Sequence, residues 1–461
     1  MINIEELSKI CLRHDTEIVS VTEEREYKTQ KGRALPPFVR IRLVSKPSES
    51  SHIRHELWLP EDWNGIFLGT GNGGLAGVIR IEKLEFGTFR GCATAHTDMG
   101  TYDGTRRGVN CPDVHKDFGW RATYLMTVVG KQLTEAYYGR SIRHSYFVGG
   151  STGGQQALTM AQRYPDQYEG IVAGVPVTDR NHLHAYFVWC YNKLRDAHGK
   201  PLFDAEDAPR ITQKVMEYCH SIKAIPEEEN FLTDSYVNYG GFIDRFIQYL
   251  AESDIGFNEA QLAALDAVYR GPVDSRTGER IYCGMPMGSE SNNHGIVSFL
   301  GDKCPYFFPF TWAFGEDLRP EDFEFAEQID VLDGALAHEL NATNPDLSAF
   351  FDRGGKLFMF SGSADPCVPY PPHTAYFGRV NEVCGRDKTW AGMRYFVIPG
   401  QDHKAGVARY GKAVMNGDVV ISDNLAVIRK WCEKGIDPCS FDVVTPNGGD
   451  GFVTKRIFAW E

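Results

Sequence analysis

The sequence has no long apolar run, and this limits its relation to membranes. None of its stretches approaches the 18 consecutive apolar residues that a membrane-spanning helix needs. Residues 1–10 also lack a basic start followed by an apolar segment, so no signal peptide is visible. We therefore expect no membrane partner and a cytosolic location, or secretion if the natural chain begins further upstream.

Cysteine pairs with metal-binding spacing are also missing. The eleven cysteines are scattered singly, without a C-x-x-C motif, and their number is odd. We interpret most of them as small buried hydrophobic residues in a reducing compartment. From this pattern we expect no zinc site and no cofactor.

Positive charge is in short supply. The chain has 48 Lys and Arg against 61 Asp and Glu, a formal net charge of −13. This balance argues against nucleic acid or an anionic membrane as the main partner. The hydrophobic content of 42% is that of an ordinary soluble globular protein, and 461 residues are enough to bury a large core.

What the sequence does contain is an alternation of short apolar strands with helices, which predicts a parallel sheet. The alternation lapses into helices and aromatic-rich loops between about 179 and 340. We therefore predict an α/β core of residues 1–178 and 341–461, with residues 179–340 inserted as a lid over the strand ends. The expected strands are 17–21, 39–44, 55–59, 66–68, 92–96, 146–148, 170–174, 355–361 and 393–399; the expected helices include 119–138, 155–163 and 425–434, followed by an irregular tail.

The stretch 145–158 is the strongest local signal. Gly149-Gly-Ser-Thr-Gly153 lies between a predicted strand and a predicted helix, and it fits the G-x-S-x-G nucleophile elbow. Glycines on both sides of Ser151 permit the strained turn that lifts a serine oxygen clear of the sheet. In a chain with 47 glycines, an ordinary Gly-rich turn is the alternative.

A nucleophilic serine needs a base, and the base needs an orienting acid. Asp365 follows the predicted strand 355–361, and His403 follows the strand 393–399, where ligands bind in open α/β sheets. We predict Asp365 as the acid and His403 as the base. Asp402 is a rival acid, but its side chain should diverge from the neighbouring imidazole. His96 also follows a strand, yet it precedes the elbow, and we interpret it as a wall or core residue.

The oxyanion donors should come from the Thr152 backbone and from the glycine loop 69–74. Gly73 or Gly74 is the expected source, because glycine lets the backbone approach closely. The same loop matches the dinucleotide fingerprint G-x-G-x-x-G, with Asp98 near the place of a ribose-binding acid. The residues after Gly74 are poor for a phosphate-binding helix, so we favour the oxyanion interpretation.

With these residues in place, the chain resembles the tannase and feruloyl esterase family. The resemblance covers most of the chain and rests on ordered segments at 59–65, 71–77, 146–154, 162–165, 170–174, 344–350 and 354–357. It implies an α/β-hydrolase core with an inserted lid and hydrolysis of small aromatic esters, such as gallate, hydroxycinnamate or hydroxyethyl terephthalate esters.

Two departures from the family pattern have consequences. Family members typically join a cysteine before the nucleophile to a cysteine after the histidine, but here these positions are Gly150 and Lys404. The disulfide cannot form, so packing and hydrogen bonds must hold Ser151 and His403 together. The family also carries a calcium loop in the lid, and residues 219–230 lack its ligand spacing. We therefore expect no structural calcium.

Substrate recognition should lie in the lid, where the resemblance is thinnest. Aromatic residues near position 310 are candidates for sandwiching an aromatic acyl group, with packing of the lid onto the core as the alternative. Since members acting on acidic substrates use a lid arginine against the carboxylate, an arginine in this region is a further candidate. The candidates are Phe307, Phe308, Trp312, Phe314 and Arg319.

The sequence thus predicts a serine carboxylic-ester hydrolase with an acyl-enzyme intermediate. An acyltransferase, a lactone hydrolase or a lyase on the same scaffold is the main alternative. A catalytically silent binding protein is a third reading, less favoured because serine, histidine and aspartate are all present. The oligomeric state is not predicted.

Overall fold

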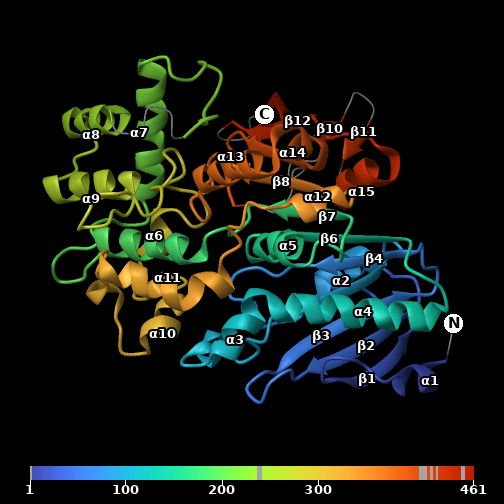
Figure 1. The fold of residues 1–461 in the computed structure, drawn as a ribbon. Coiled ribbons are helices and arrows are strands. Elements are labelled where there is room, and N and C mark those ends of the chain that lie inside the picture. Colours follow the sequence, from blue (N-terminus) through green and yellow to red (C-terminus); the bar gives the residue numbers. More distant parts are fainter. Residues whose placement is uncertain are drawn as a thin grey trace.

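A computed structural model describes residues 3–235, 241–403, 413–415, 419–421, 424–447 and 452–460. Its centre is a nine-stranded sheet with the order β1-β2-β3-β5-β4-β6-β7-β8-β9 (Figure 1). The strands are β1 (Thr16–Glu24), β2 (Phe38–Ser45), β3 (Ile53–Pro60), β4 (Ile66–Thr70), β5 (Ala93–Thr97), β6 (His144–Gly150), β7 (Gly170–Gly174), β8 (Lys356–Gly362) and β9 (Met393–Ile398).

The sheet is parallel where the candidate site lies. From β5 through β4, β6, β7 and β8 to β9, every neighbouring pair runs parallel, whereas β1, β2, β3 and β5 pair antiparallel. The parallel strands therefore end at a common edge, where the loops after β4, β6, β8 and β9 lie. This arrangement is the α/β-hydrolase core that the sequence predicts.

Alternating strand residues face two different cores. Phe67 and Phe147 point into a cluster with α4 and α5, while Leu68 and Tyr146 point into a cluster with α15. Helices thus cover both faces, which explains why the central strands read as continuous apolar runs. The helices around the sheet are α1 (Ile4–Ser8), α2 (Ile81–Thr88), α3 (Pro112–Lys116), α4 (Ala122–Tyr138), α5 (Thr152–Arg163), α12 (Ser348–Asp352), α13 (Pro371–Cys384), α14 (Arg386–Gly392) and α15 (Asn424–Lys434).

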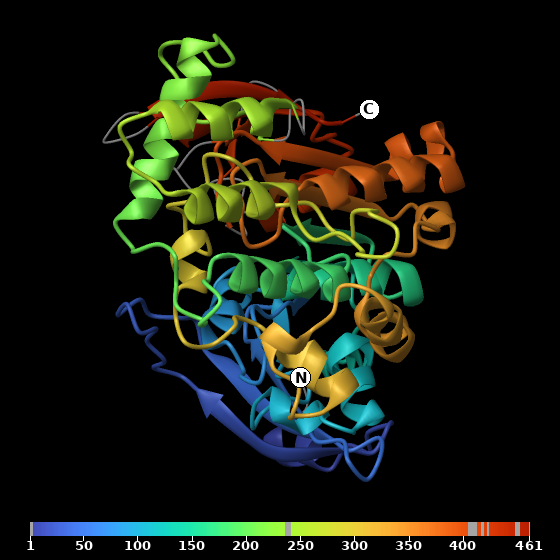
Figure 2. The same ribbon diagram turned by 90° about the vertical axis from the view of Figure 1, so that its left-hand side faces the viewer.

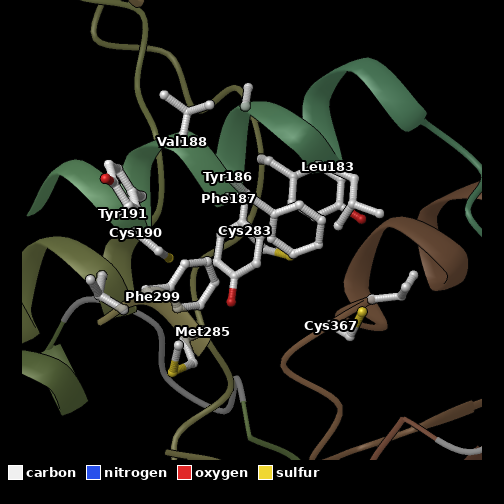
Figure 3. Close-up of a cluster of buried hydrophobic side chains, with 14 of the residues drawn as sticks. Leu183, Tyr186, Phe187, Val188, Cys190, Tyr191, Cys283, Met285, Phe299 and Cys367 are labelled. Carbon is white, nitrogen blue, oxygen red and sulfur yellow. The ribbon is translucent and has the colours of Figure 1, made fainter. Parts of the chain in front are cut away.

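Helices also dominate the region between β7 and β8, and they gather on one side of the molecule (Figures 1 and 2). Tyr186 and Phe187 of the first of them pack toward Phe299 and Met285, and Cys367 from the segment after β8 lies beside this cluster (Figure 3). The predicted boundaries at 178 and 340 remain a prediction. The helices are α6 (Arg180–Lys193), α7 (Asp207–Ser221), α8 (Gly241–Glu252), α9 (Glu259–Arg270), α10 (Phe308–Phe314) and α11 (Glu327–Leu340).

The irregular tail predicted after residue 434 is wrong. A second, antiparallel sheet has the order β11-β10-β12-β13, and it comprises β10 (Ala413–Met415), β11 (Val419–Ile421), β12 (Ser440–Pro446) and β13 (Phe452–Phe458). Phe441 pairs with Ile457, and both are buried against the core. Charged residues such as Asp442, Lys455 and Arg456 obscure the apolar pattern of β12 and β13 in the sequence, and the glycine-rich segment 447–451 separates the two strands.

In the ranges that the structure covers, no helix is both long enough and apolar enough to cross a bilayer.

Candidate active site

Ser151 occupies the turn between β6 and α5 in a strained backbone conformation. Its φ of 60° and ψ of −123° lie outside the regions that residues with side chains ordinarily adopt. Such conformations cost about 1–3 kcal/mol and persist only where the surroundings enforce them. The turn joins the end of a strand to the start of a helix, as the nucleophile-elbow motif predicts.

The glycines around Ser151 are required by backbone packing. A Cβ atom at Gly149 would lie 2.0 Å from the Gly153 carbonyl oxygen, and a Cβ at Gly153 would lie 2.7 Å from the Asn72 carbonyl oxygen. A Cβ at Gly71 would in turn lie 2.5 Å from the Gly153 Cα. The elbow and the loop after β4 are therefore in direct backbone contact.

The structure brings His403 and Asp365 to this serine. His403 Nε2 lies 3.0 Å from the Ser151 hydroxyl oxygen, and His403 Nδ1 lies 2.8 Å from Asp365 Oδ2. Both ring nitrogens thus have partners other than the rival Asp402. These distances suit a tautomer in which Nδ1–H donates to the carboxylate and Nε2 accepts from the serine.

Asp365 is held rigidly on the loop after β8. Its side chain is fully buried, and Oδ1 accepts hydrogen bonds from the backbone N–H groups of Cys367 and Val368, both at 2.9 Å. The second oxygen is left for His403. A buried carboxylate bonded in this way is fixed in one orientation.

The charge of Asp365 determines the protonation of His403. Burial alone lowers the pKa of His403, but the charge of Asp365, the nearby Cys367 and their hydrogen bonds raise it, and the net pKa is well above its ordinary value. Burial raises the pKa of the Cys367 thiol, yet the charges and hydrogen bonds of His403 and His294 lower it overall. The site therefore stabilises the imidazolium that forms when His403 accepts a proton.

His294, from the region between β7 and β8, lies beside His403. Its ring centroid lies 5.6 Å from that of His403, with the two planes nearly perpendicular. The His294 backbone has a φ of 73°, an unusual value for a residue with a Cβ.

The candidate oxyanion loop lies against the start of α5. The Thr152 hydroxyl donates to the Gly74 carbonyl at 2.7 Å, and the Gly153 N–H donates to the Asn72 carbonyl at 2.8 Å. Gly74 has a φ of 59°, whereas a Cβ at Gly73 would meet nothing closer than 3.8 Å. The loop conformation therefore requires a glycine at 74 more strictly than at 73.

The dinucleotide alternative does not fit these residues. The helix after the glycine loop begins only at Ile81, so its N-terminus does not follow Gly74 directly. Asp98 is fully buried in an ion pair with Arg54, at 2.6 Å, and is not open to a ribose. His96, also fully buried, bonds Asn72 Oδ1 at 3.2 Å, in agreement with its interpretation as a core residue behind the loop.

The acid loop is tied to its neighbours through Ser363. The Ser363 hydroxyl donates to the Leu232 carbonyl at 2.7 Å and accepts from the Gly400 N–H at 2.8 Å. The Asn292 amide donates to the Ala364 carbonyl at 2.8 Å. One serine thus links the Asp365 loop to the His403 loop and to the region between β7 and β8.

The five predicted substrate-contact residues all have protein partners. Phe308 and Trp312 are buried and pack against Phe118, and Trp312 Nε1 donates to the Thr105 carbonyl at 2.5 Å. Phe307 stacks on Phe310 at 5.0 Å, and Phe314 meets Phe323 edge-on at 6.0 Å. Arg319 is exposed and pairs with Asp322 at 2.7 Å. Their contact with substrate stays a prediction.

Sequence reasoning missed Arg180, His294, Cys367 and Ser363. Arg180 directly follows the carboxyl end of β7 and its turn, so the strand-end rule that identified Asp365 also applied to it. His294 lies in a loop without any sequence motif, and only the tertiary structure brings it near His403.

No metal or disulfide accounts for the arrangement of the described residues. Across those ranges, no group of three or more His, Cys, Asp or Glu side chains is arranged to hold a metal ion. All eleven cysteines lie within these ranges, and no disulfide joins them there. Lys404, one of the two positions where the family disulfide would attach, lies outside the described residues.

The fold and the enzyme class follow from the comparisons with known proteins. The fold is that of an α/β-hydrolase, and the relatives named as esterases make the protein a carboxylic-ester hydrolase. The family model described as tannase and feruloyl esterase matches residues 39–303 and 322–460. The chain therefore belongs to the tannase and feruloyl esterase family.

Three relatives illustrate the similarity. An uncharacterized esterase of Xanthomonas campestris pv. campestris is 31% identical over 454 residues, covering 88% of this chain and 77% of the relative. A probable feruloyl esterase B-2 of Aspergillus flavus is 27% identical over 425 residues, covering 87% and 78%. The crystal structure of feruloyl esterase B from Aspergillus oryzae aligns with a TM-score of 0.82 and 21% identity, covering 99% and 95%, and shows the shared fold.

The cytosolic location expected from the sequence is wrong. The homologous fungal feruloyl esterases and tannases are secreted, extracellular enzymes. The expectation rested on residues 1–10 and on unpaired cysteines, and neither feature fixes the compartment of a chain.

Proposed function

We propose that the protein hydrolyses esters of aromatic, phenolic acids through a Ser151–His403–Asp365 triad. The observation that carries this proposal is the continuous hydrogen-bonded line from Asp365 to His403 to Ser151, at 2.8 and 3.0 Å. The names of the relatives, feruloyl esterases and a tannin acyl hydrolase, support the phenolic substrate class.

In the first half of the reaction, Ser151 Oγ attacks the ester carbonyl carbon while His403 Nε2 takes the hydroxyl proton. Asp365 stabilises the resulting imidazolium. The tetrahedral intermediate collapses when His403 gives its proton to the alkoxy oxygen, and the alcohol leaves. Ser151 then carries the acyl group.

In the second half, His403 takes a proton from water, and the hydroxide attacks the acyl carbon. The second tetrahedral intermediate expels Ser151 Oγ, which regains its proton from His403. The aromatic acid is released and the free enzyme is restored.

The negative oxygen of both intermediates needs donors. The Thr152 N–H, at the positive end of α5, and the N–H groups of Gly73 and Gly74 are the proposed donors. The side-chain bond from Thr152 to the Gly74 carbonyl holds the two segments in register.

The lid of residues 179–340 is proposed to form the acyl pocket. Phe307 and Phe314, which are only partly buried, are the aromatic candidates that have surface left for a ligand. Phe308 and Trp312 act on the pocket through packing.

The test replaces Ser151 with alanine and follows hydrolysis of p-nitrophenyl and hydroxycinnamate esters. Ser151→Ala is expected to lower kcat by about 10⁵–10⁶-fold, as in other serine hydrolases, with an unchanged melting temperature. Ser145→Ala, at the other end of the same strand, is the matched control and should keep full activity. Retained turnover in Ser151→Ala would refute the proposal, and product analysis with added alcohols would reveal acyl transfer.

A further inference from the structure

Arg180 is a buried cation beside the candidate oxyanion hole. It begins α6, just past the end of β7, and only 2% of its surface is exposed. Burial lowers the pKa of the Arg180 guanidinium to about 9, which still leaves it charged at neutral pH. A charge withdrawn from water is costly unless something compensates it.

Its contacts aim the guanidinium at the start of α5. Nη2 donates to the Thr152 hydroxyl at 3.1 Å, Nε donates to Gln155 Oε1 at 2.8 Å, and Nη1 lies 3.4 Å from His184 Nε2. The rings of Phe118 and Phe308 lie 5.0 and 5.9 Å from the guanidinium carbon. All of these partners are neutral, His184 because burial and the Arg180 charge push its pKa well below the ordinary value.

Within the described ranges, the side-chain hydrogen bonds of Arg180 go to Thr152, Gln155 and His184, and none of these partners is a carboxylate. The adjacent Asp179 is engaged elsewhere: its carboxylate accepts from Asn341 Nδ2 at 2.9 Å and faces His182 at 3.1 Å. Among the described residues, the buried charge of Arg180 therefore has no carboxylate partner.

Hydrogen bonds connect the Arg180 guanidinium to both segments of the candidate oxyanion hole. Arg180 donates to the Thr152 hydroxyl, and the same hydroxyl donates to the Gly74 carbonyl. Thr152 and Gly74 belong to the two segments whose N–H groups are the proposed oxyanion donors. A fixed cation behind these donors strengthens the field at the oxygen where negative charge develops, because the surroundings are dry.

We propose that Arg180 is a positioning residue that places a fixed positive charge behind the oxyanion hole and aligns its two donor segments through Thr152. This inference rests on the proposed triad function. It explains why the described residues offer this buried arginine no carboxylate: the negative charge that Arg180 faces develops in the tetrahedral intermediates. It also assigns Phe308 a second role, as part of the apolar wall that keeps water from the guanidinium.

The experiment compares binding of a charged and a neutral ligand. An aryl boronic acid forms an anionic tetrahedral adduct with a catalytic serine, whereas the amide of the same aromatic acid binds as a neutral ground-state analogue. Arg180→Met and Arg180→Gln are expected to raise the boronate Ki and lower kcat by about 10–100-fold, below the effect of losing a direct oxyanion donor. The amide Ki and the ester KM should change less than about twofold.

Arg180→Lys retains the charge and should recover part of the lost kcat and boronate affinity. If boronate and amide affinities fall together, or if the neutral variants keep wild-type kcat, the proposal is overturned and Arg180 only supports packing. Should Arg180→Met fail to fold, Arg180→Gln carries the same comparison. Wild-type enzyme that binds no boronate, or a Ser151→Ala variant that binds it equally well, would instead refute the triad.

Discussion

The two halves of the candidate site are held together by different means. In the nucleophile half, backbone packs directly on backbone: Gly71, Gly149 and Gly153 leave no room for a Cβ atom. In the acid–base half, single side-chain hydrogen bonds join separate segments, with Ser363 linking the loop of Asp365 to Leu232 and to Gly400. The first half is therefore rigid by steric exclusion, and the second depends on the polar contacts that replace the absent disulfide.

The two halves also differ in how far apart in the sequence their contacting residues lie. Most residues that shape the nucleophile turn lie within a few positions of Ser151, and Gly71 and Asn72 of the loop after β4 complete its packing. The position of His403 depends on contacts with chain segments far away in sequence, including the region between β7 and β8. We therefore expect substitutions of the packed glycines in the nucleophile half to act mainly on stability, and substitutions in the acid–base half to act mainly on activity.

Among the substitutions that compare the two halves, the largest effect is expected for Asp365, which bonds His403. Asp365→Asn should lower kcat by about 10⁴-fold, because the amide favours the wrong tautomer of His403. Asp365 raises the pKa of His403 against the effect of burial, so its loss should lower that pKa. Since the proposed mechanism uses neutral His403 as the base, activity should fall as pH drops through this pKa, and the acidic limb of kcat/KM should move to lower pH in the variant.

The same pair has a predicted effect on stability. Because the folded pKa of His403 lies above its ordinary value of 6.5, the stabilisation is complete below about pH 6.5 and is lost as pH rises through the folded pKa. Asp365→Asn should therefore reduce the melting temperature more at acidic than at alkaline pH. An acidic limb that stays in place or moves upward would contradict this assignment.

The second-largest effect is expected for Gly149, in the tightly packed nucleophile half. Gly149→Ala should destabilise the protein by about 3–5 kcal/mol, because its Cβ would lie 2.0 Å from the Gly153 carbonyl oxygen. The matched control is Gly378→Ala in α13, where the Cβ meets open space, and a gain of about 0.5–1 kcal/mol is expected. Chemical denaturation measures both. Comparable stability of the two variants would show that the elbow is not held by steric exclusion.

The smallest effect is expected for Ser363, whose hydrogen bonds hold the acid–base half together. Ser363→Ala leaves the Leu232 carbonyl and the Gly400 N–H without this partner, at a cost of about 1–3 kcal/mol. We expect kcat to fall about tenfold, with a nearly unchanged KM, because His403 loses its alignment rather than its chemistry. Steady-state kinetics measure the change, and the exposed Ser8→Ala is the control. An unaltered kcat would mean that other contacts hold the His403 loop.

Much of the fold was accessible from the sequence. The strand-end rule placed Ser151, Asp365 and His403 on loops at one edge, because parallel strands end together. The glycine spacing around the serine predicted the elbow, since few other residues fit such a turn.

The rest depends on tertiary contacts that leave no local pattern. Arg180 and Ser363 act through partners more than twenty positions away in the chain, and His294 belongs to a loop without a motif. The aromatic residues near position 310 could not be divided into packing and substrate-facing groups, because both uses need the same side chains. The C-terminal strands β12 and β13 were missed because charged residues such as Asp442, Lys455 and Arg456 interrupt their apolar positions.

Covalent labelling of Ser151 with an aryl fluorophosphonate tests the central claim most directly. Peptide mass spectrometry should find the label on Ser151 in the wild-type enzyme, in proportion to lost activity, and should find almost none in His403→Ala. Full inactivation with the label on another residue, or equal labelling of the two proteins, would contradict the account.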